Sequence, residues 1–195
     1  EKEPLGLGHA VLCARKFIGP EPFAVLLGDD VVDSAVPCIG QLMAVYAEKG
    51  GTVLGVQPVS RSEIHKYGIV EGAAGKGPLW RVKGLVEKPP REKAPSNLAV
   101  LGRYVLEPEI FAVLEHTAPG AGGEIQLTDA LHALAATRPV RAYSFTGKRY
   151  DVGDRLGFLQ ATVEYALSRE DLSRDLAAYL RRLVQEDPRL QKMEE

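Results

Sequence analysis

The sequence predicts an α/β fold in which helices flank a mixed, mostly parallel β-sheet. The apolar run at 23–27 (FAVLL) is uninterrupted, which is typical of strands that a parallel sheet buries on both faces. Apolar residues then recur at helical spacing over 39–46, and this helix ends at a Gly-Gly pair. A second apolar strand at 52–59 follows directly, so the three segments form a strand–helix–strand unit with a right-handed crossover.

The other elements follow from the same patterns in chain order. A glycine-punctuated loop at 4–9 leads into a short helix at 10–17 before the first strand. After the crossover unit, strands at 67–71 and 79–87 flank a Gly-rich turn at 72–77 and form a hairpin. The remaining strands are predicted at 97–106 and 140–145, and the remaining helices begin at Pro108 and cover 124–137, 154–169 and 171–184, with a loop at 147–153.

Composition indicates one globular domain. The chain has 195 residues, 45% of them hydrophobic, which is enough for one substantial core. We expect this domain to span 1–184, followed by a charged tail at 185–195.

The net charge of −2 argues against nucleic acid as a partner, and no apolar run is long enough to suggest a membrane partner. Cys13 and Cys38 are expected to be buried free thiols, as in a cytoplasmic protein.

Two acidic segments are candidate metal sites. Asp29 and Asp30 follow the 23–27 strand, and ligands of open α/β sheets bind beyond the carboxyl ends of strands. Adjacent carboxylates there suit Mg²⁺, which prefers one or two carboxylates together with phosphates and water. A solvated turn that caps the next helix explains the same residues. Asp151 is a candidate second carboxylate, or else part of an Asx turn next to a helix N-cap at Asp154.

Two further segments are candidate substrate contacts. Glu87 and Lys88 end a strand just before Pro89, which bends the chain. The carboxylate would accept hydrogen bonds from sugar hydroxyls and the lysine would meet a phosphate; an exposed ion pair of negligible energy is the alternative. The Gly-rich stretch at 119–129 leads into a helix whose N-terminus could attract an anion. A tight turn, with Glu124 in the first helical turn, explains the same pattern.

Eight motifs in a fixed order connect these segments with one family. They are 4–12 (PLGLGHAVL), 27–30 (LGDD), 66–70 (KYGIV), 86–89 (VEKP), 94–99 (APSNLA), 102–104 (GRY), 122–130 (GGEIQLTDA) and 149–153 (RYDVG). With these motifs the chain resembles the bacterial UTP–glucose-1-phosphate uridylyltransferases over nearly its whole length. The APSNLA and GGEIQLTDA stretches separate this family from its thymidylyl- and adenylyl-transferring relatives. The resemblance implies a Rossmann-like fold of the nucleotide-diphospho-sugar transferase type.

The resemblance also implies a role for each matching residue. The positions matched to the nucleotide and the metal are Leu7, Gly8, His9, Asp29, Asp30 and Asp151. The first three would bring backbone close to uracil, Asp29 and Asp151 would hold Mg²⁺, and Asp30 would assist. The positions matched to the sugar side are Gly68, Glu87, Lys88, Val100, Tyr104 and Glu124. Among these, Glu87 would accept sugar hydroxyls, Lys88 would contact phosphate, and Gly68 would admit the hexose to the backbone.

The implied reaction is the synthesis of UDP-glucose from UTP and glucose 1-phosphate. A phosphate oxygen of glucose 1-phosphate would attack the α-phosphorus of UTP in line, assisted by Mg²⁺, and pyrophosphate would leave without a covalent enzyme intermediate. The implied partners are these substrates and further copies of the chain, because the family forms homo-oligomers through the region after Asp154.

The chain departs from the family at its start. The family begins with a Gly-rich loop that holds an arginine and is followed by a lysine, and no segment here matches that loop. We therefore expect an N-terminally incomplete fold whose isolated chain is weakly active or inactive. Three alternatives remain: a nucleotidylyltransferase for another base or sugar, a metal-dependent glycosyltransferase of similar fold, and a non-catalytic sugar-nucleotide-binding module.

Overall fold

The computed structural model of the chain describes residues 4–73 and 77–191. It divides into two compact units, each of which is discontinuous in sequence. The first comprises Glu1–Gly28 and Val32–Lys148, and the second comprises Asp29–Val31 and Arg149–Glu195. Of the predicted hairpin turn at 72–77, residues 74–76 lie outside the described part of the chain.

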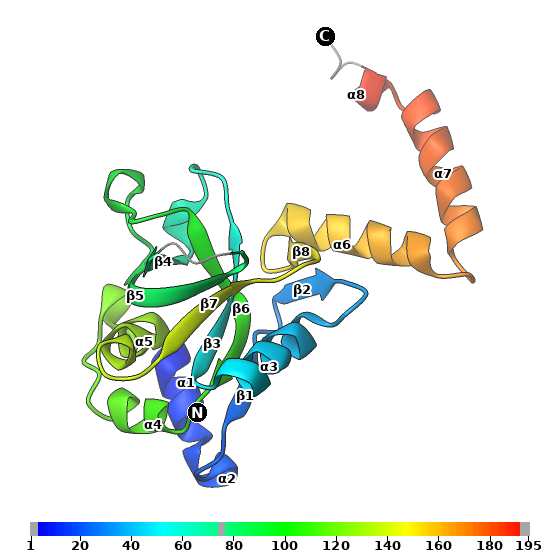
Figure 1. Cartoon of the computed structure of the whole chain (residues 1–195). Helices are drawn as coiled ribbons and strands as arrows, with labels where there is room; N and C mark the ends of the chain where they lie inside the picture. The colour runs from blue at the N-terminus through cyan, green and yellow to red at the C-terminus, as the bar shows by residue number, and fades with distance from the viewer. Residues whose placement is uncertain (1–3, 74–76, 192–195) are drawn as a thin grey trace. The chain divides into compact units, whose positions relative to one another are not determined.

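The first unit is built on a six-stranded mixed sheet, as counted within the described residues (Figure 1). Its strands, in spatial order, are β1 (Phe23–Leu26), β6 (Leu98–Leu106), β3 (Thr52–Pro58), β7 (Val140–Ser144), β5 (Leu79–Glu87) and β4 (Gly68–Ala73). β3 and β7 pair in parallel, and the other pairings are antiparallel. It follows that β1, β3, β7 and β4 run in one direction while β6 and β5 run in the other. The predicted α/β fold with flanking helices is confirmed, but the sheet is mixed rather than mostly parallel, because only β3 and β7 among its described strands pair in parallel.

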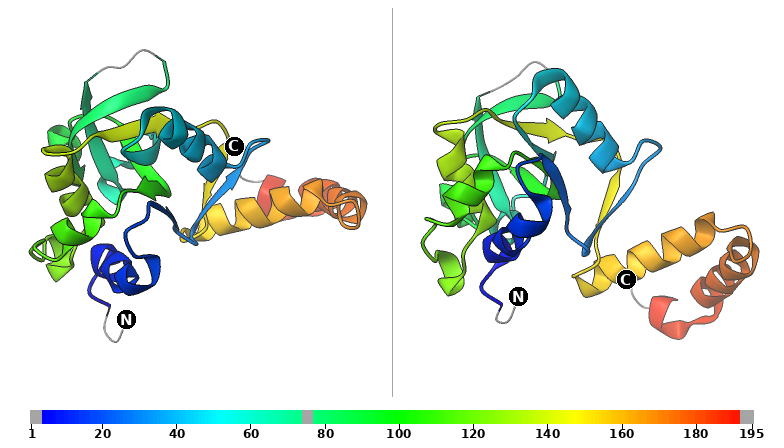
Figure 2. Two further views of the ribbon diagram at one scale, coloured as in Figure 1. Left: turned by 60° about the horizontal axis from the view of Figure 1, so that its bottom comes forward. Right: turned by 90° about the horizontal axis from the view of Figure 1, so that it is seen from below.

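Helices cover both faces of this sheet because its strands alternate their apolar side chains. Leu54 and Val56 of β3 enter one core, which they share with helices α1 (Leu7–Cys13), α4 (Glu109–Leu114) and α5 (Leu127–Ala135). Val53, the residue before Leu54, enters the second core with α3 (Cys38–Lys49). The views in Figure 2 show α3 on the opposite face of the sheet from α4 and α5. This side-to-side alternation follows from the two-residue period of a strand.

Several predicted elements differ from the observed ones. The 23–27 run was expected to be buried on both faces, but β1 alternates half-buried and exposed residues, and Leu26 is 53% exposed. The physical reason is that β1 lies at the end of the strand order and pairs with β6 alone among the described strands. The helix expected at 10–17 is two short helices, α1 and α2 (Arg15–Ile18), and Cys13 is exposed rather than buried.

The second unit contains a short strand and three helices. β8 (Lys148–Asp151) occupies part of the predicted loop at 147–153 and pairs with β2 (Asp30–Asp33). The helices are α6 (Arg155–Ser168), α7 (Ser173–Glu186) and α8 (Pro188–Gln191), so part of the expected tail is helical. Tyr150 packs on Tyr165 and donates a hydrogen bond to Glu164 Oε2 at 2.7 Å, which anchors α6 to β8.

Within the described residues no helix combines the length and apolar character that crossing a membrane requires.

Candidate active site

A carboxylate and a hydroxyl meet at the backbone of Gly68 in the first unit. Gly68 begins β4 and lies directly opposite Glu87, the last residue of β5. A Cβ atom placed on Gly68 would lie 2.8 Å from Thr128 Oγ1 and 3.2 Å from Glu87 Oε2. Any side chain at this position would therefore displace one of these groups. A cavity of about 360 Å³ adjoins Glu87 and is also lined by Asp129 and His132 of α5. The arrangement offers oxygen atoms to a ligand with hydroxyl groups.

Lys88 has an unusual backbone conformation that brings it to the side of Glu87. It is the one described residue other than glycine with a positive φ, 43°. Neighbouring side chains of a strand point to opposite faces, and the left-handed turn at Lys88 breaks this alternation. Lys88 Nζ consequently lies 3.7 Å from Glu87 Oε1, with the lysine side chain half exposed and the glutamate largely buried. The bend expected at Pro89 therefore occurs one residue earlier. Such strain in a non-glycine residue is concentrated at functional sites.

The structure does not bring the other residues matched to the sugar side into contact with Glu87 by any described interaction. Val100 and Tyr104 of β6 are both buried in the core that contains α5. Glu124 was expected in the first turn of a helix, but α5 begins at Leu127 and Glu124 is extended, with φ −98° and ψ 147°. Its carboxylate instead accepts a hydrogen bond from Gln126 Nε2 at 3.1 Å.

The motif matched to uracil is helical rather than a loop. Leu7, Gly8 and His9 form the first turn of α1, and the preceding Gly6 has a φ of 102°. Gly8 N–H donates to Ile125 O at 2.8 Å, and a Cβ atom on Gly8 would lie 2.7 Å from that same oxygen. The absence of a side chain at Gly8 is thus explained by packing against the backbone before α5.

In the second unit the two carboxylates matched to the metal converge. Asp151 ends β8, and Val152 N–H donates to Asp29 O at 2.8 Å, which ties the two segments together. A Cβ atom placed on Gly153 would lie 3.3 Å from Asp151 Oδ1 and 3.4 Å from Asp29 Oδ2. The two carboxylates therefore face the same small space. Asp154 caps α6 by accepting hydrogen bonds from Leu156 N and Gly157 N, as one interpretation of the sequence predicted.

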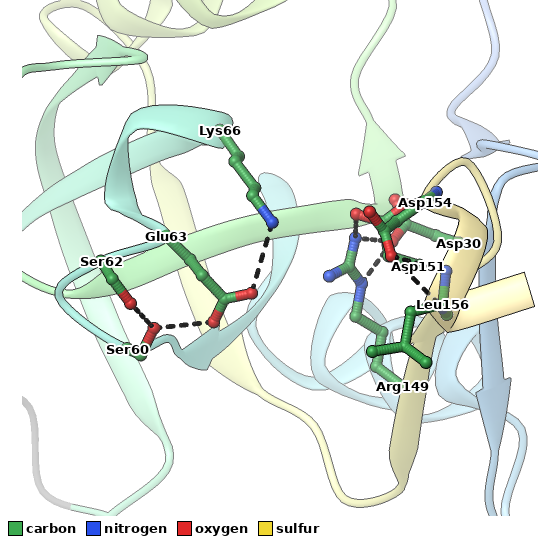
Figure 3. A network of polar contacts seen from close by, with 10 residues as sticks. Asp30, Ser60, Ser62, Glu63, Lys66, Arg149, Asp151, Asp154 and Leu156 are labelled. Carbon is green, nitrogen blue, oxygen red and sulfur yellow. Dashed lines mark hydrogen bonds and ion pairs between the residues drawn. The ribbon is translucent and has the colours of Figure 1, made fainter. Parts of the chain in front are cut away.

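Arg149 organises the acidic residues of this unit (Figure 3). Its guanidinium forms an ion pair and a hydrogen bond with the carboxylate of Asp30, and NH2 lies 3.3 Å from Asp151 Oδ2. Burial raises the pKa of Asp30 above its ordinary value, while the charge and hydrogen bond of Arg149 act in the opposite direction. The Asp30 carboxylate is thus already paired with the Arg149 guanidinium.

These residues fit a divalent cation in one specific way. Among the described residues no group of three or more histidines, cysteines and carboxylates converges as a protein-only metal site. Two converging carboxylates match Mg²⁺, whose remaining positions are filled by phosphates and water. The donor set of Asp29 and Asp151 is therefore suited to a cation that arrives with a phosphorylated substrate.

Sequence reasoning missed two side chains at these sites. Thr128 and Arg149 both lie within recognised motifs but were given no role. Their importance depends on tertiary neighbours, namely Gly68 for the threonine and Asp30 for the arginine. The available signal was weak: a charged residue two positions before Asp151, and a hydroxyl in the first turn of a helix.

Known proteins with similar sequences indicate which enzymes this chain is related to. UTP–glucose-1-phosphate uridylyltransferases of Staphylococcus epidermidis and Bacillus subtilis are 54% and 52% identical over 183 and 187 residues, or 94% and 96% of this chain. The chain spans 64% of the length of each of these curated relatives.

Two solved structures are also similar. A UDP-glucose pyrophosphorylase complexed with UDP-glucose aligns with a TM-score of 0.83 and 41% identity, covering 86% of this chain and 64% of that one. A UTP-bound UGPase from Acinetobacter baumannii aligns with a TM-score of 0.80 and 39% identity, covering 95% and 63% of the two chains. The family model described as "Nucleotidyl transferase" matches residues 1–168. Because this match covers most of the chain, the chain belongs to the nucleotidyl transferase family.

Proposed function

We propose that the protein to which this chain belongs makes UDP-glucose and pyrophosphate from UTP and glucose 1-phosphate. The observation that carries this proposal is the convergence of Asp29 and Asp151 beside Gly153, because transfer between two phosphorylated substrates needs a group that offsets their negative charge. The choice of uracil and glucose rests on the relatives, which are named for UTP and glucose 1-phosphate and include one complexed with UDP-glucose.

Each unit has its own task in this proposal. In the first, Glu87 accepts hydrogen bonds from hexose hydroxyls, the Gly68 backbone and Thr128 border the ring, and Lys88 contacts the sugar phosphate. We assign Val100, Tyr104 and Glu124 to the surroundings of the hexose, and the first turn of α1 with Leu7 and His9 to uracil, by resemblance only. The N–H of Gly8 already has an acceptor, so its contribution is to let α1 pack closely.

In the second unit, Asp29 and Asp151 hold the cation and Arg149 positions Asp151. Bound Mg²⁺ would neutralise charge on the phosphate oxygens. Asp30 would remain a partner of Arg149 rather than a direct substrate contact. A phosphate oxygen of glucose 1-phosphate attacks the α-phosphorus of UTP and pyrophosphate departs, so no residue of the chain has to become covalently modified.

Calorimetric titration of the 195-residue chain with UDP-glucose tests the proposal. We expect binding that Mg²⁺ strengthens and that exceeds binding of dTDP-glucose. Glu87→Gln should weaken binding roughly tenfold or more, since a charged group with two acceptor oxygens is replaced by a neutral amide with one. Asp29→Asn should remove the effect of Mg²⁺, whereas the controls Glu71→Gln on β4 and Asp33→Asn on β2 should not. A chain that binds UDP-glucose neither with nor without Mg²⁺ would refute the proposal.

Two further properties belong to the same proposal. Cys13 and Cys38 are free thiols, which fits a reducing compartment, and we place the reaction in the cytoplasm. We also expect the chain to associate with copies of itself through the exposed apolar side chains of α6 and α7, such as Phe158 and Val184.

A further inference from the structure

A polar cavity is lined by none of the residues assigned to substrate and metal. It has a volume of about 520 Å³ and is lined by the turn that leads into η1 (Ile64–Lys66), by the first residue of η1, and by the loop between β5 and β6, which contains η2 (Arg91–Lys93). Arg61 and Arg91 contribute the cations of its lining. Gly68, Glu87 and Thr128 are absent from that lining. The volume is within the usual range for small-molecule sites, about 300–1,000 Å³.

The two guanidinium groups of this cavity are not neutralised. Neither Arg61 nor Arg91 forms an ion pair or a side-chain hydrogen bond with another residue that the structure describes. The acid nearest to Arg61 in sequence, Glu63, is already engaged: Ser60 Oγ donates to its Oε2 at 2.8 Å and Lys66 Nζ lies 3.6 Å from its Oε1 (Figure 3). Glu92 also lines the cavity without pairing with either arginine. Both cations remain available to a ligand.

Hydrogen bonds within the chain hold part of the cavity lining in place without a ligand. Ser96 Oγ donates to Val70 O at 2.6 Å and accepts from Leu98 N at 3.0 Å. Asn97 Nδ2 donates to Val59 O at 3.3 Å, and Ile64 is only 3% exposed. A loop held by such bonds loses little conformational entropy when it binds a ligand.

We propose that this cavity binds the phosphate group of a small molecule between Arg61 and Arg91. Guanidinium groups match phosphate oxygens with paired hydrogen bonds, and two of them balance a phosphate dianion. The Glu92 carboxylate is then free to accept a hydrogen bond from a hydroxyl of the same ligand. The phosphate could be inorganic or part of a hydroxylated phosphate ester. The site is distinct from the proposed catalytic residues and does not depend on turnover.

Titration of the chain with inorganic phosphate and, separately, with glycerol 3-phosphate tests the proposal and tells the two sources apart. We expect the double variant Arg61→Gln/Arg91→Gln to bind the preferred probe roughly tenfold more weakly or worse. Lys93→Gln should bind as the unaltered chain does, because Lys93 lies on the same turn and loses the same charge but does not line the cavity. The conservative double variant to lysine keeps both charges but not the paired geometry, so its affinity should fall in between.

Backbone amide shifts locate the bound probe independently of affinity. Ile64 and Ala94 line the cavity, and their NMR signals should move on titration in the unaltered chain but not in the glutamine double variant. Circular dichroism melts of both double variants show whether the fold is kept. Unchanged phosphate affinity in the folded glutamine variant would overturn the proposal. An equal loss of affinity in Lys93→Gln would overturn it as well, because it would show that only general surface charge is involved.

Discussion

Gly68 shows how one missing side chain can define a site. Its backbone lies against both Thr128 and Glu87, and a methyl group would meet Thr128 Oγ1 at 2.8 Å. We predict that Gly68→Ala shifts the Glu87 carboxylate, weakens UDP-glucose binding at least roughly tenfold and lowers the unfolding free energy by about 1–3 kcal/mol, the usual cost of overpacking. Calorimetry and urea unfolding measure the two effects.

Gly72 on the same strand is the matched control for that substitution. A methyl group there would find its nearest neighbour, Arg81 O, at 3.6 Å, which is ordinary contact. Gly72→Ala should therefore leave UDP-glucose affinity unchanged. Equal affinity losses in both variants would show that the effect belongs to β4 in general and not to the space shared with Glu87.

The Asp30–Arg149 pair provides a second prediction at the scale of residues. Both side chains are largely buried, with exposures of 9% and 13%. Because Arg149→Gln leaves the Asp30 carboxylate buried without a counter-charge, it should cost about 3–5 kcal/mol of unfolding free energy. Adding Asp30→Asn should restore part of that loss in a double-mutant cycle measured by urea unfolding.

An exposed arginine–aspartate ion pair is the control for the buried Asp30–Arg149 pair. Arg169 and Asp171 are joined by hydrogen bonds of 2.8 and 2.9 Å, yet their side chains are 63% and 61% exposed. Arg169→Gln should leave the unfolding free energy almost unchanged, because solvent screens an exposed ion pair. An Arg149→Gln chain as stable as Arg169→Gln would contradict the assigned role of Arg149.

At the residue scale, the sequence could predict acids at strand ends but not what they contact. Asp29 and Asp151 were identified as candidate partners because each follows a strand, and their convergence beside Gly153 agrees with that prediction. By contrast, the engagement of Asp30 by Arg149 depends on the pairing of β2 with β8, two short strands that no hydrophobic pattern marked. Position in the chain was enough to single out Asp29 and Asp151 as candidates, whereas the partner of Asp30 depends on strand register.

At the scale of elements, α1 shows that a helical glycine can be a packing residue. Alanine normally stabilises a helix interior relative to glycine. On Gly8, however, a methyl group would lie 2.7 Å from Ile125 O and 2.9 Å from Leu114 Cδ2. We predict that Gly8→Ala destabilises the chain by about 1–3 kcal/mol because α1 must move away from its neighbours.

Gly40 in α3 supplies the opposite case. A methyl group there would have no neighbour within 4 Å. Gly40→Ala should stabilise the chain by about 0.4–1 kcal/mol, since the gain in helix propensity meets no clash. Thermal unfolding of the two variants should therefore shift in opposite directions, and shifts of the same sign would contradict the packing role of Gly8.

Element prediction succeeded where apolar periodicity was long and failed where it was short or ambiguous. The nine-residue strands β5 and β6 and the 12-residue helix α3 appear close to their expected limits. β8 was missed because its four residues, KRYD, contain a single apolar ring. The 124–137 helix was expected to start three residues too early, since glutamate at 124 suits a helix start although the backbone there is extended.

At the scale of the whole molecule, the second unit leaves apolar surface uncovered. In α7, all of whose residues are described, none is buried, although Leu176, Leu180 and Leu183 follow helical spacing along one stripe. Large apolar side chains with at least 38% exposure in this unit are Leu156, Phe158, Leu159, Tyr165, Leu167, Leu172, Tyr179 and Val184. A set of this size on consecutive helices is typical of an interaction surface.

A second copy of the chain is the partner that this surface fits best. α7 carries both signs of charge at each end, with Arg174 and Asp175 in its first turn and Arg181, Arg182 and Glu186 in its second half, so a two-fold arrangement can pair opposite charges around the apolar stripe. We predict that the chain self-associates in multi-angle light scattering at micromolar concentration. Phe158→Glu, which places a charge in the apolar set, should shift the population to monomer.

Met43→Glu on α3 is the control, because Met43 is 56% exposed, close to the 55% of Phe158, but lies in the first unit. A strictly monomeric unaltered chain, or dissociation by both substitutions alike, would exclude this surface as the site of association.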